Sequence, residues 1–547
     1  MPIDKSDWTL VDLVRRQGAR YGEREFISFE QGDKLTFAGF DRDSDAVALR
    51  LSALGVGPGD RVLALVKNRI ELLVTMFATF KLGAVYVPIN TELKGAFLQH
   101  QLRNAEPKVV LVDTVLADAF QGVDAGDGEI GDGEIGAVVF IAGGLPDAMP
   151  AVFADVRRLT YEDLAALAPN GADVLVTPKP EDIAFIMYTS GTTGPSKGVL
   201  MPHAHCYLFG VGTQRALELT EADRYYICMP LFHANGLLMQ LFGSFIAGAW
   251  IYVVERFSPN RWLDDVRNSQ ATVTNALGVM PEFIFRHPAN PLDRDNHLRI
   301  IMAAPVADEW AADFERRFDL KIRQGFGMTE CNIPAYTGPD DPLEVGCAGQ
   351  IMDEFFEVRI GNVDTDEPLA ANEIGEILVR PKEPSCFMAG YFKMPEKTVE
   401  AWRNLWFHTG DAGRMDASGR LYFVDRLKDC IRRRGENISS FEVEQVLNNH
   451  PAIAESAVVG IRVEGAGGEE EVKALVILAP GQEIENVALL DYCAEHMPRF
   501  AVPRYIEWID NLAKTATGKI QKQELRDAGV TRGTWDRESV GYKVARR

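Results

Sequence analysis

Apolar residues in the first part of the chain form short continuous runs separated by segments of helical periodicity. The runs 61–66, 83–88 and 109–112 are rich in β-branched residues and are bounded by turn residues, which predicts buried strands. Segment 70–82 is a helix candidate between two of these strands. Strands alternating with helices predict βαβ units and a largely parallel sheet, so we expect an α/β fold.

The alternation resumes over 183–330 and then changes character. Short strands between turn residues predict a smaller β-rich subdomain over roughly 345–425. The remaining segment mixes helices and strands in the manner of a compact α+β unit. We therefore expect a large N-terminal domain over 1–427, built of αβ subdomains with parallel sheets, and a small C-terminal domain over 428–547.

Composition and charge exclude several classes of partner. The 547 residues are 46% hydrophobic and 25% charged, as in a soluble globular enzyme, and no apolar run is long enough to span a bilayer. The net charge of -22 disfavours binding to nucleic acid or insertion into an anionic membrane. Seven scattered cysteines without CxxC spacing predict reduced thiols, and no secretory or peroxisomal signal is evident, so we expect a cytoplasmic protein. Anionic ligands would require a local concentration of cationic residues.

The segment 188–198, Tyr-Thr-Ser-Gly-Thr-Thr-Gly-Pro-Ser-Lys-Gly, follows an apolar strand. Its glycines allow tight turns that present N–H groups to an anion, and its hydroxyls add donors. A clamp on a polyphosphate is predicted, with a plain turn as the alternative; its residues are Thr189, Ser190, Gly191, Thr192, Thr193, Gly194 and the cationic Lys197. The lysine precedes the glycine, unlike in a GxxxxGK[ST] loop, and a second strand follows, so we expect a β-hairpin.

This segment resembles the phosphate loop of the adenylate-forming superfamily, which includes acyl-CoA synthetases, luciferases and peptide-synthetase adenylation domains. Further segments similar to that family follow in the family's order, at 324–330, 409–411, 425–429, 434–437 and 517–520. Nearly the whole chain is covered, and its appearance is closest to crotonobetaine/carnitine–CoA ligases. The resemblance implies an AMP-forming acid–CoA ligase that uses ATP, Mg²⁺ and coenzyme A, and a C-terminal domain that is mobile.

The resemblance also implies a nucleotide site. Glu330 supplies the hard oxygen ligand that Mg²⁺ prefers, and the Phe326 ring is expected against adenine, where the family usually has Tyr. Asp411 is expected to accept both ribose hydroxyls, and Arg426 to reach the ribose or the α-phosphate. The other expected nucleotide-binding residues are Ala303, Ala304, Pro305, Gln324, Gly325, Gly327, Met328, Thr329, Arg432 and Asn437.

Adenylation and thioester formation take place at the same carbonyl carbon and require different groups around it. The resemblance implies that the C-terminal domain rotates about a hinge at Lys428 between the two steps. Lys519 is expected to be the catalytic lysine of adenylation, bridging the carboxylate and the α-phosphate. Lys197, His233 and Glu330 complete the expected catalytic set. Consecutive arginines form a cationic patch suited to the phosphates of CoA, with a solvated charge run as the alternative. The expected CoA-binding residues are Arg256, Arg433, Arg434 and Gly435.

An acyl pocket is expected from His233, Asn235, Gln240, Met280, Met302, Cys331 and Asn332. A lone histidine among apolar residues is usually a core residue, but the resemblance places His233 between the acyl and pantetheine pockets. Met302 either narrows the acyl pocket or packs in the core. The amides among apolar residues favour a small-to-medium polar acid, resembling carnitine or crotonobetaine.

Several alternatives stay open. Medium-chain fatty acids and aryl acids are alternative substrates of a CoA ligase. An adenylating enzyme for another acceptor and a catalytically silent nucleotide-binding scaffold are alternative functions. A homodimer is expected only from the resemblance to the family.

Overall fold

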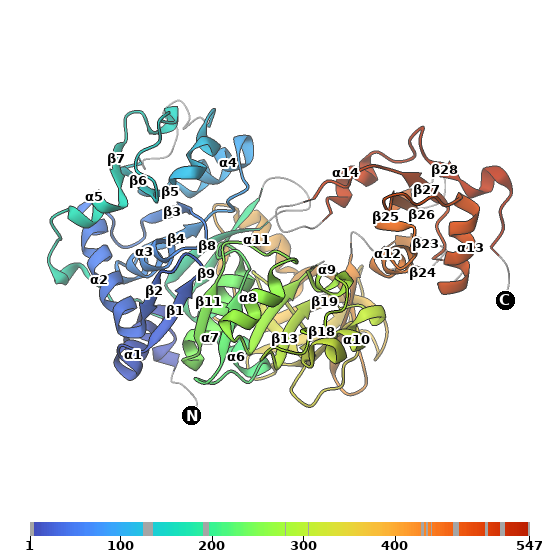
Figure 1. Cartoon of the computed structure of the whole chain (residues 1–547), viewed down its shortest axis with the longest axis horizontal. Coiled ribbons are helices and arrows are strands. Elements are labelled where there is room, and N and C mark those ends of the chain that lie inside the picture. The colour runs from blue at the N-terminus through green and yellow to red at the C-terminus, as the bar shows by residue number, and fades with distance from the viewer. Residues whose placement is uncertain are drawn as a thin grey trace.

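The computed structural model describes eleven stretches of the chain. The described residues are 5–123, 135–189, 196–278, 280–304, 306–427, 431–433, 436–438, 440–462, 470–497, 501–514 and 520–544. Figure 1 shows a large N-terminal part, coloured blue to yellow, beside a smaller C-terminal unit in orange and red.

An eight-stranded sheet forms one layer of the N-terminal part. Its strands are β3 (Arg61–Leu65), β4 (Val85–Pro88), β5 (Val109–Asp113), β6 (Ala137–Ile141), β7 (Arg157–Thr160), β8 (Ile183–Thr189), β9 (Lys197–Pro202) and β20 (Gly390–Tyr391). The order is β20-β9-β8-β4-β3-β5-β6-β7, parallel from β8 to β7 and antiparallel at β9 and β20. The three strands expected from the first apolar runs lie in this sheet, and their prediction is confirmed.

A seven-stranded sheet forms a second layer. Its strands are β1 (Glu25–Phe29), β2 (Lys34–Thr36), β10 (Arg224–Ile227), β11 (Trp250–Val253), β12 (Val273–Leu277), β13 (Ile300–Ala304) and β14 (Lys321–Arg323). The order is β14-β13-β12-β10-β11-β1-β2, with every pair parallel except β1 and β2. The N-terminal hairpin thus pairs with a strand more than 200 residues further along the chain, a pairing that no local pattern predicts.

Helices pack between and around these sheets. They are α1 (Leu10–Tyr21), α2 (Phe37–Ala53), α3 (Ile70–Lys81), α4 (Gly95–Ala105), α5 (Tyr161–Ala166), α6 (His203–Ala216), α7 (Phe242–Ala247), α8 (Trp262–Ser269), α9 (Met280–Arg286) and α10 (Asp308–Phe318), with a π-helix at Asn235–Leu241. The predicted helix α3 is almost entirely buried. Its Lys81 is fully buried, and Nζ lies 2.6 Å from a carboxylate oxygen of Asp41 and of Asp45 on α2, which compensates the buried charge.

A seven-stranded antiparallel sheet forms the β-rich subdomain. Its strands are β15 (Gly325–Met328), β16 (Asn332–Tyr336), β17 (Cys347–Ile351), β18 (Phe356–Gly361), β19 (Gly375–Pro381), β21 (Phe407–Met415) and β22 (Arg420–Arg426), in the order β15-β16-β17-β22-β21-β19-β18. Helix α11 (Pro395–Ala401) precedes β21. The sheet starts at Gly325 and not near 345 as expected, because the β15–β16 hairpin pairs with β17 at the sheet edge.

The C-terminal unit has its own hydrophobic core. Its elements are β23 (Ile431–Arg433), β24 (Glu436–Ile438), α12 (Ser440–Asn448), β25 (Ile453–Arg462), β26 (Glu470–Leu478), α13 (Asn486–His496), β27 (Tyr505–Trp508), α14 (Lys522–Asp527) and β28 (Trp535–Asp536). Apolar side chains of α12, α13 and the four-stranded sheet β25-β26-β27-β28 pack together in that core. The chain therefore has the expected α/β class, with a large N-terminal domain and a smaller C-terminal one.

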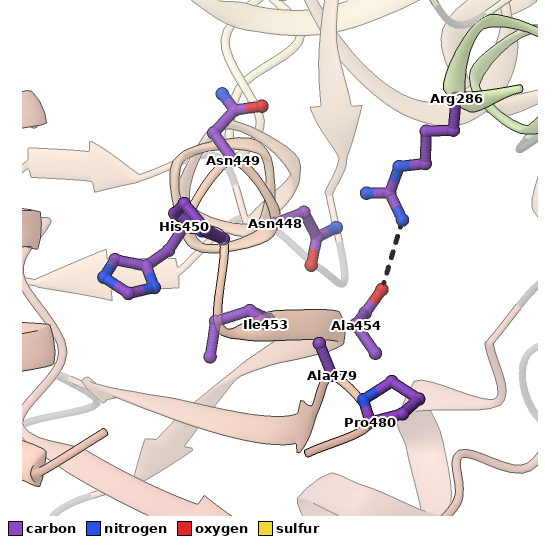
Figure 2. Close-up of a pocket in the computed structure, with 9 residues that line it drawn as sticks. Arg286, Asn448, Asn449, His450, Ile453, Ala454, Ala479 and Pro480 are labelled. Carbon is purple, nitrogen blue, oxygen red and sulfur yellow. Dashed lines mark hydrogen bonds between the residues drawn. The ribbon is translucent and has the colours of Figure 1, made fainter. Parts of the chain in front are cut away.

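The C-terminal unit approaches the large part at Arg286, the last residue of α9. Arg286 Nη1 donates to the carbonyl oxygen of Ala454 at 3.5 Å, and both residues line a pocket (Figure 2). The pocket is lined by Arg286, Asn448, Asn449, His450, Pro451, Ile453, Ala454, Ala479 and Pro480. None of the residues predicted to bind a ligand lines this pocket. Within the described stretches, none of the helices has both the length and the apolarity needed to cross a membrane.

Candidate active site

The predicted phosphate-binding segment joins two antiparallel strands. Strands β8 and β9 pair from Ile183 with Pro202 to Thr189 with Lys197, which confirms the expected hairpin. Thr189 and Lys197 are therefore cross-strand neighbours at the base of the loop. The loop itself, Ser190, Gly191, Thr192, Thr193, Gly194 and Pro195, lies outside the described residues.

Helix α4 forms hydrogen bonds with both sides of this hairpin next to the loop, at Tyr188 and at Ser196. The sequence did not predict this contact. The His100 ring Nε2 lies 3.0 Å from the Ser196 carbonyl oxygen, and Gln101 Nε2 donates to the Ser196 hydroxyl at 3.0 Å. On the other strand, the Tyr188 hydroxyl donates to Asn104 Oδ1 at 2.7 Å. Ser196, directly before Lys197, is thus held by the side chains of His100 and Gln101.

A buried carboxylate lies beside the base of the hairpin. Glu330 is 5% exposed, and its Oε1 accepts hydrogen bonds from the Thr189 hydroxyl at 3.3 Å and the Tyr391 hydroxyl at 3.2 Å. Lys197 Nζ lies 4.1 Å from the centroid of the Tyr391 ring. The structure therefore brings together Thr189, Lys197 and Glu330, which the sequence placed in one site.

Tyr391 was not predicted to belong to the site. It lies on β20, which pairs with β9 at the sheet edge, with Tyr391 opposite Val199. Burial and the nearby Glu330 raise the pKa of Tyr391, so its hydroxyl stays protonated and donates to the carboxylate. In the sequence, Tyr391 is distinguished only as an aromatic residue after a glycine. The pairing of β20 with β9, which brings Tyr391 to Glu330, joins segments that lie far apart in the chain.

The Glu330 carboxylate fits a divalent cation. Both hydroxyl donors bond to Oε1, and Oε2 has no hydrogen bond from the residues that the structure describes. A carboxylate oxygen in this state is a suitable ligand for Mg²⁺. The hydroxyl donors would hold the carboxylate in one orientation while Oε2 binds the ion.

A buried histidine supports the segment that carries Glu330. The His205 ring Nε2 donates to the carbonyl oxygen of Thr329 at 2.9 Å, and Asn332 Nδ2 donates to the His205 carbonyl at 2.8 Å. Burial lowers the pKa of His205 to about 4, so the ring is neutral near pH 7. Asn332 was expected to line an acyl pocket, but it is fully buried and its amide bonds to the main chain of α6.

The expected adenine-binding segment, residues 324–329, contains strand β15 (Gly325–Met328), which pairs with β16 in a hairpin. A side chain at Gly327 would place its Cβ 2.5 Å from the Asn332 carbonyl oxygen, so the close approach of β16 requires glycine there. Phe326 is 5% exposed and stacks on Phe423, with 6.3 Å between ring centroids. Little of the ring faces outward in this conformation, and its contact with adenine remains a prediction.

Strand β13 carries the other expected adenine wall. Ala303 is buried and Ala304 is partly exposed at the end of β13, whereas Pro305 lies outside the described residues. Met302 is 3% exposed, and its Cε lies 3.4 Å from the place that a Cβ on Gly325 would occupy. Met302 therefore packs against the adenine segment, which agrees with its core interpretation.

The expected ribose pair lies on adjacent strands. Asp411 on β21 pairs with Arg426 on β22, and Arg426 Nε lies 3.9 Å from Asp411 Oδ1. Burial raises the pKa of the Cys331 thiol, and the charges of Glu330 and Asp411 both add to that rise. Glu330 in the turn between β15 and β16 and Asp411 on β21 both belong to the antiparallel β-rich subdomain.

The expected acyl-pocket residues are in part linked by hydrogen bonds. Asn275 on β12 donates to Asn235 Oδ1 at 3.1 Å and accepts from the Tyr225 hydroxyl at 2.5 Å. The His233 ring Nδ1 accepts from the backbone N–H of Asn235 at 3.3 Å. Gln240 is fully buried, yet neither polar atom of its side chain has a hydrogen-bond partner in the described part of the chain.

The expected CoA residues have different surroundings. Arg433 is 3% exposed and its guanidinium lies 2.6 Å from the Glu471 carboxylate, so in this conformation it forms a buried ion pair and is not presented to a ligand. Arg256 is exposed. Outside the described residues lie Lys428, Arg434, Gly435 and Lys519, together with the side chains of Arg432 and Asn437.

Comparisons with known proteins match nearly the whole chain. Residues 14–392 match the family model of the AMP-binding enzymes, and residues 442–519 match that of the AMP-binding enzyme C-terminal domain. The crotonobetaine/carnitine–CoA ligase of Salmonella heidelberg (strain SL476) is 30% identical over 535 residues, covering 94% of this chain and 100% of the relative.

Solved structures of CoA ligases share the fold. ATP-bound MatB from Rhodopseudomonas palustris has a TM-score of 0.80 at 27% identity and covers 95% of this chain and 98% of its own. The O-succinylbenzoate coenzyme A synthetase MenE from Bacillus subtilis, in complex with AMP, has a TM-score of 0.78 at 26% identity and covers 94% of this chain and 98% of its own. The anthranilate CoA ligase AuaEII with anthranoyl-AMP has a TM-score of 0.81 at 25% identity and covers 95% of this chain and 97% of its own.

Proposed function

The chain belongs to the AMP-binding enzyme family as an AMP-forming acyl-CoA synthetase, and we propose that it joins a small-to-medium polar carboxylic acid to coenzyme A. One observation carries the proposal for the site. Thr189, Lys197 and Glu330 meet at the base of one hairpin, where a cation, a hydroxyl and a carboxylate suit the phosphates and Mg²⁺ of ATP.

The reaction has two steps at one carbonyl carbon. A carboxylate oxygen attacks the α-phosphorus of ATP, the bond to the bridging oxygen breaks, and pyrophosphate leaves. The CoA thiolate then attacks the carbonyl carbon of the acyl adenylate, and AMP leaves with the oxygen that came from the acid. Activation is needed because the oxide of a free carboxylate is a poor leaving group, whereas AMP is a good one.

Each part of the nucleotide is assigned to residues with suitable side chains. We assign Lys197, Thr189 and the loop 190–194 to the phosphates, and Asp411 with Arg426 to the ribose. Glu330 would hold Mg²⁺ through Oε2, and the ion would offset phosphate charge when bound. The adenine is assigned to the segment 324–329 and to Ala303, Ala304 and Pro305.

The C-terminal domain is proposed to supply Lys519 for adenylation and the segment around Gly435 for thioester formation, by rotation about Lys428. The separate core of the C-terminal unit supports a rigid-body rotation. Asp425, three residues before the proposed hinge, accepts from the Ser440 hydroxyl at 2.8 Å and from the Phe441 backbone N–H at 3.3 Å at the start of α12. These hydrogen bonds join the two sides of the proposed hinge in this conformation.

A polar acid is favoured by the π-helix that follows His233. A π-helix bonds residues five apart, so Asn235, Met239 and Gln240 share a face, and Asn235 Nδ2 lies 3.2 Å from Met239 Sδ on that face. The Gln240 amide there is buried and has no hydrogen-bond partner among the residues that the structure describes. Leaving such a group unpaired costs about 1–3 kcal/mol, and a hydrogen-bonding substituent on the acid would satisfy it.

The relatives are named for different acids and therefore do not identify the acid that this protein uses. Their names specify crotonobetaine or carnitine, O-succinylbenzoate and anthranilate. An aryl acid is therefore the second candidate substrate, favoured by the two structural neighbours that act on aryl acids. Both candidates carry polar substituents, in keeping with an amide in the acyl pocket.

A substrate panel tests the proposal. Purified protein with ATP, Mg²⁺ and CoA is given betaines, hydroxy acids, straight-chain acids from C4 to C12 and aryl acids, and AMP and pyrophosphate are followed. CoA-dependent AMP release with a polar or aryl acid is expected. Pyrophosphate release without acyl-CoA would point to another acceptor, and no release with any acid would contradict the proposal.

A further inference from the structure

The segment that carries Asp411 is a bulge in the β19–β21 pair. Glu376 pairs with Ala412 and Leu378 pairs with His408, so only Ile377 lies opposite the residues 409–411. Bulges leave ladder groups unpaired and re-aim a side chain, and they are frequent beside active sites. The position of the Asp411 carboxylate therefore depends on what holds these three residues.

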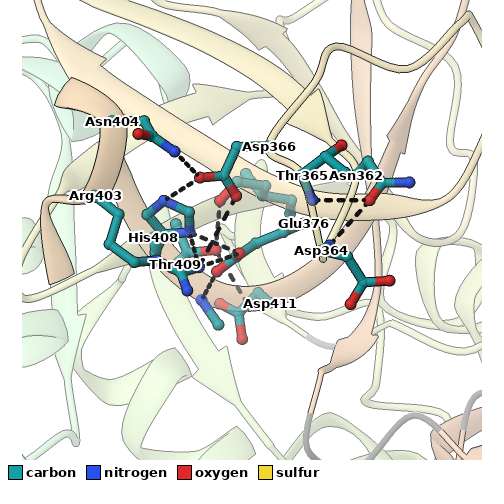
Figure 3. A network of polar contacts seen from close by, with 12 residues as sticks. Asn362, Asp364, Thr365, Asp366, Glu376, Arg403, Asn404, His408, Thr409 and Asp411 are labelled. Atoms are coloured by element: carbon teal, nitrogen blue, oxygen red, sulfur yellow. Dashed lines mark hydrogen bonds and ion pairs between the residues drawn. The ribbon is translucent and has the colours of Figure 1, made fainter. Parts of the chain in front are cut away.

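Side chains replace the missing ladder bonds (Figure 3). Glu376 Oε1 accepts from the Gly410 N–H at 2.9 Å, and the Thr409 hydroxyl donates to the Ile377 carbonyl at 2.7 Å. The Thr409 hydroxyl oxygen also accepts from the Asp411 N–H at 3.1 Å. Gly410 has φ +72°, a conformation that favours glycine. The bulge is thus fixed by one carboxylate, one hydroxyl and one glycine.

A buried network holds Glu376 in turn. Glu376 is 4% exposed, and its Oε2 lies 2.8 Å from His408 Nδ1. His408 Nε2 lies 3.5 Å from Asp366 Oδ2, which accepts from Asn404 Nδ2 at 2.5 Å. The Arg403 guanidinium is part of the network: its Nη2 lies 2.9 Å from His408 Nδ1, 4.0 Å from Glu376 Oε2 and 3.9 Å from Asp366 Oδ1. Each buried carboxylate is therefore paired, as buried charges require.

We propose that Glu376, held by His408, is a positioning residue that fixes the Asp411 bulge and thereby sets the affinity for the ribose of the nucleotide. This inference rests on the proposed function, in which Asp411 accepts the ribose hydroxyls. Glu376 acts through the Gly410 N–H and does not itself touch the nucleotide. Because two hydroxyls must meet two carboxylate oxygens, a small displacement of Asp411 weakens both bonds.

A metal site is the competing interpretation of the same residues. Ligand atoms of Asp366, Glu376 and His408 all lie within 4.8 Å of one another. Arg403, Asn404 and the Gly410 N–H already supply positive charge and donors to the two carboxylates. A cation would have to displace them, so the geometry favours the hydrogen-bonded network.

Calorimetric binding of AMP and of 2′-deoxy-AMP tests the proposal, because the ratio of the two Kd values reports the ribose contact and not overall folding. Wild type is expected to bind AMP at least about tenfold more tightly. In Glu376→Ala the ratio is expected to fall toward one. Glu376→Gln keeps an acceptor for the Gly410 N–H and is expected to retain most of the ratio.

Two further variants make the outcome decisive. Glu376→Asp shortens the side chain and replaces the alanine variant if that one does not fold; its ratio should also fall. Glu357→Gln, an ion-pair partner of Arg380 on the same sheet, is the control and should bind both nucleotides as wild type does.

The possible outcomes separate this inference from the proposed function. A ratio that stays at the wild-type value in both the alanine and aspartate variants overturns the inference alone. Absence of AMP binding by wild type overturns the proposed function and this inference together.

Discussion

The Tyr391 hydroxyl donates to Glu330 at 3.2 Å and so joins the edge strand β20 to the turn between β15 and β16. The bond goes to the same carboxylate oxygen that accepts from Thr189, which leaves the other oxygen for a cation. Glu330 is therefore oriented by residues from two distant parts of the chain. This orientation underlies the assignment of Mg²⁺ to Glu330.

Removing the tyrosine hydroxyl should weaken the response to Mg²⁺. In Tyr391→Phe the ring over which Lys197 lies is kept, but Glu330 loses one donor. A hydrogen bond to a charged group contributes about 1.5–3 kcal/mol, so the Mg²⁺ concentration for half-maximal activity should rise about tenfold or more. Activity measured against MgCl₂ at fixed ATP checks this.

A second tyrosine–glutamate bond provides the control for that experiment. The Tyr422 hydroxyl donates to Glu344 at 2.8 Å, and neither residue is assigned to Mg²⁺ or to the phosphates. Tyr422→Phe should leave the Mg²⁺ response unchanged. Equal shifts in both variants would contradict the assignment of Mg²⁺ to Glu330.

The stability of the protein should fall as the pH is lowered from 7.5 to 5. Burial lowers the pKa of His203 to about 3 and that of His205 to about 4, against an ordinary value of 6.5. Below pH 6.5 the unfolded chain binds protons that the folded protein does not, so folding loses about 1.4 kcal/mol per pH unit for each histidine. The loss continues until the folded values are reached.

Urea denaturation at both pH values measures this loss. His205→Gln keeps a side-chain donor for the Thr329 carbonyl but cannot titrate, so it should lose less stability than wild type between pH 7.5 and 5. The comparison with wild type cancels the contribution of the carboxylates that titrate in the same range. An unchanged pH dependence in the variant would show that His205 is not buried in its neutral form.

Gln240 should determine the preference for polar acids. Gln240→Leu removes an amide that has no partner within the described stretches, so the free energy of unfolding should rise by about 1 kcal/mol without substrate. At the same time kcat/KM for a polar acid should fall about tenfold relative to an apolar acid of equal length. Denaturation and paired kinetics on 3-hydroxybutyrate and butyrate provide the two readouts.

A glutamine on α6 serves as the matched control. Gln214 donates to the Leu219 carbonyl at 3.3 Å and is not among the expected acyl-pocket residues. Gln214→Leu should leave the ratio of the two acids unchanged. If Gln240→Leu leaves that ratio unchanged as well, Gln240 does not contact the acid.

Lys519 should be needed for one half-reaction only. Lys519→Ala is expected to slow pyrophosphate release from acid and ATP by about 10²–10³-fold, because a charge that stabilises the adenylation transition state is lost. The variant should still convert supplied acyl-AMP and CoA to acyl-CoA at a rate near that of wild type. Rapid-quench analysis of each half-reaction checks this, and loss of both would contradict the division of roles.

Local pattern predicted the elements that are buried along most of their length. Strands β3, β4 and β5 and helix α3 followed from continuous apolar runs, and the β8–β9 hairpin followed from a strand directly after Lys197. The proximity of site residues that belong to one local segment was also predictable. Thr189 and Lys197 are cross-strand neighbours, as a hairpin requires.

Long-range pairing was not predictable from the sequence. The place of Tyr391 depends on the β20–β9 pair, and the bulge at Asp411 depends on Glu376 of a different strand. Arg433 was expected to bind CoA because three arginines are consecutive, but Glu471 on β26 buries it in an ion pair. Each of these outcomes depends on a partner that lies far away in the sequence, where neither periodicity nor spacing carries a signal.

Transfer of carboxylate oxygen to AMP tests the adenylate mechanism most directly. The acid identified by the panel is labelled with ¹⁸O in both carboxylate positions and is incubated with the protein, ATP, Mg²⁺ and CoA, and the products are analysed by mass spectrometry. An acyl-adenylate intermediate predicts one ¹⁸O in the phosphate of AMP for each acyl-CoA formed. Acyl-CoA formed with unlabelled AMP, or with ADP and labelled inorganic phosphate, would contradict the account.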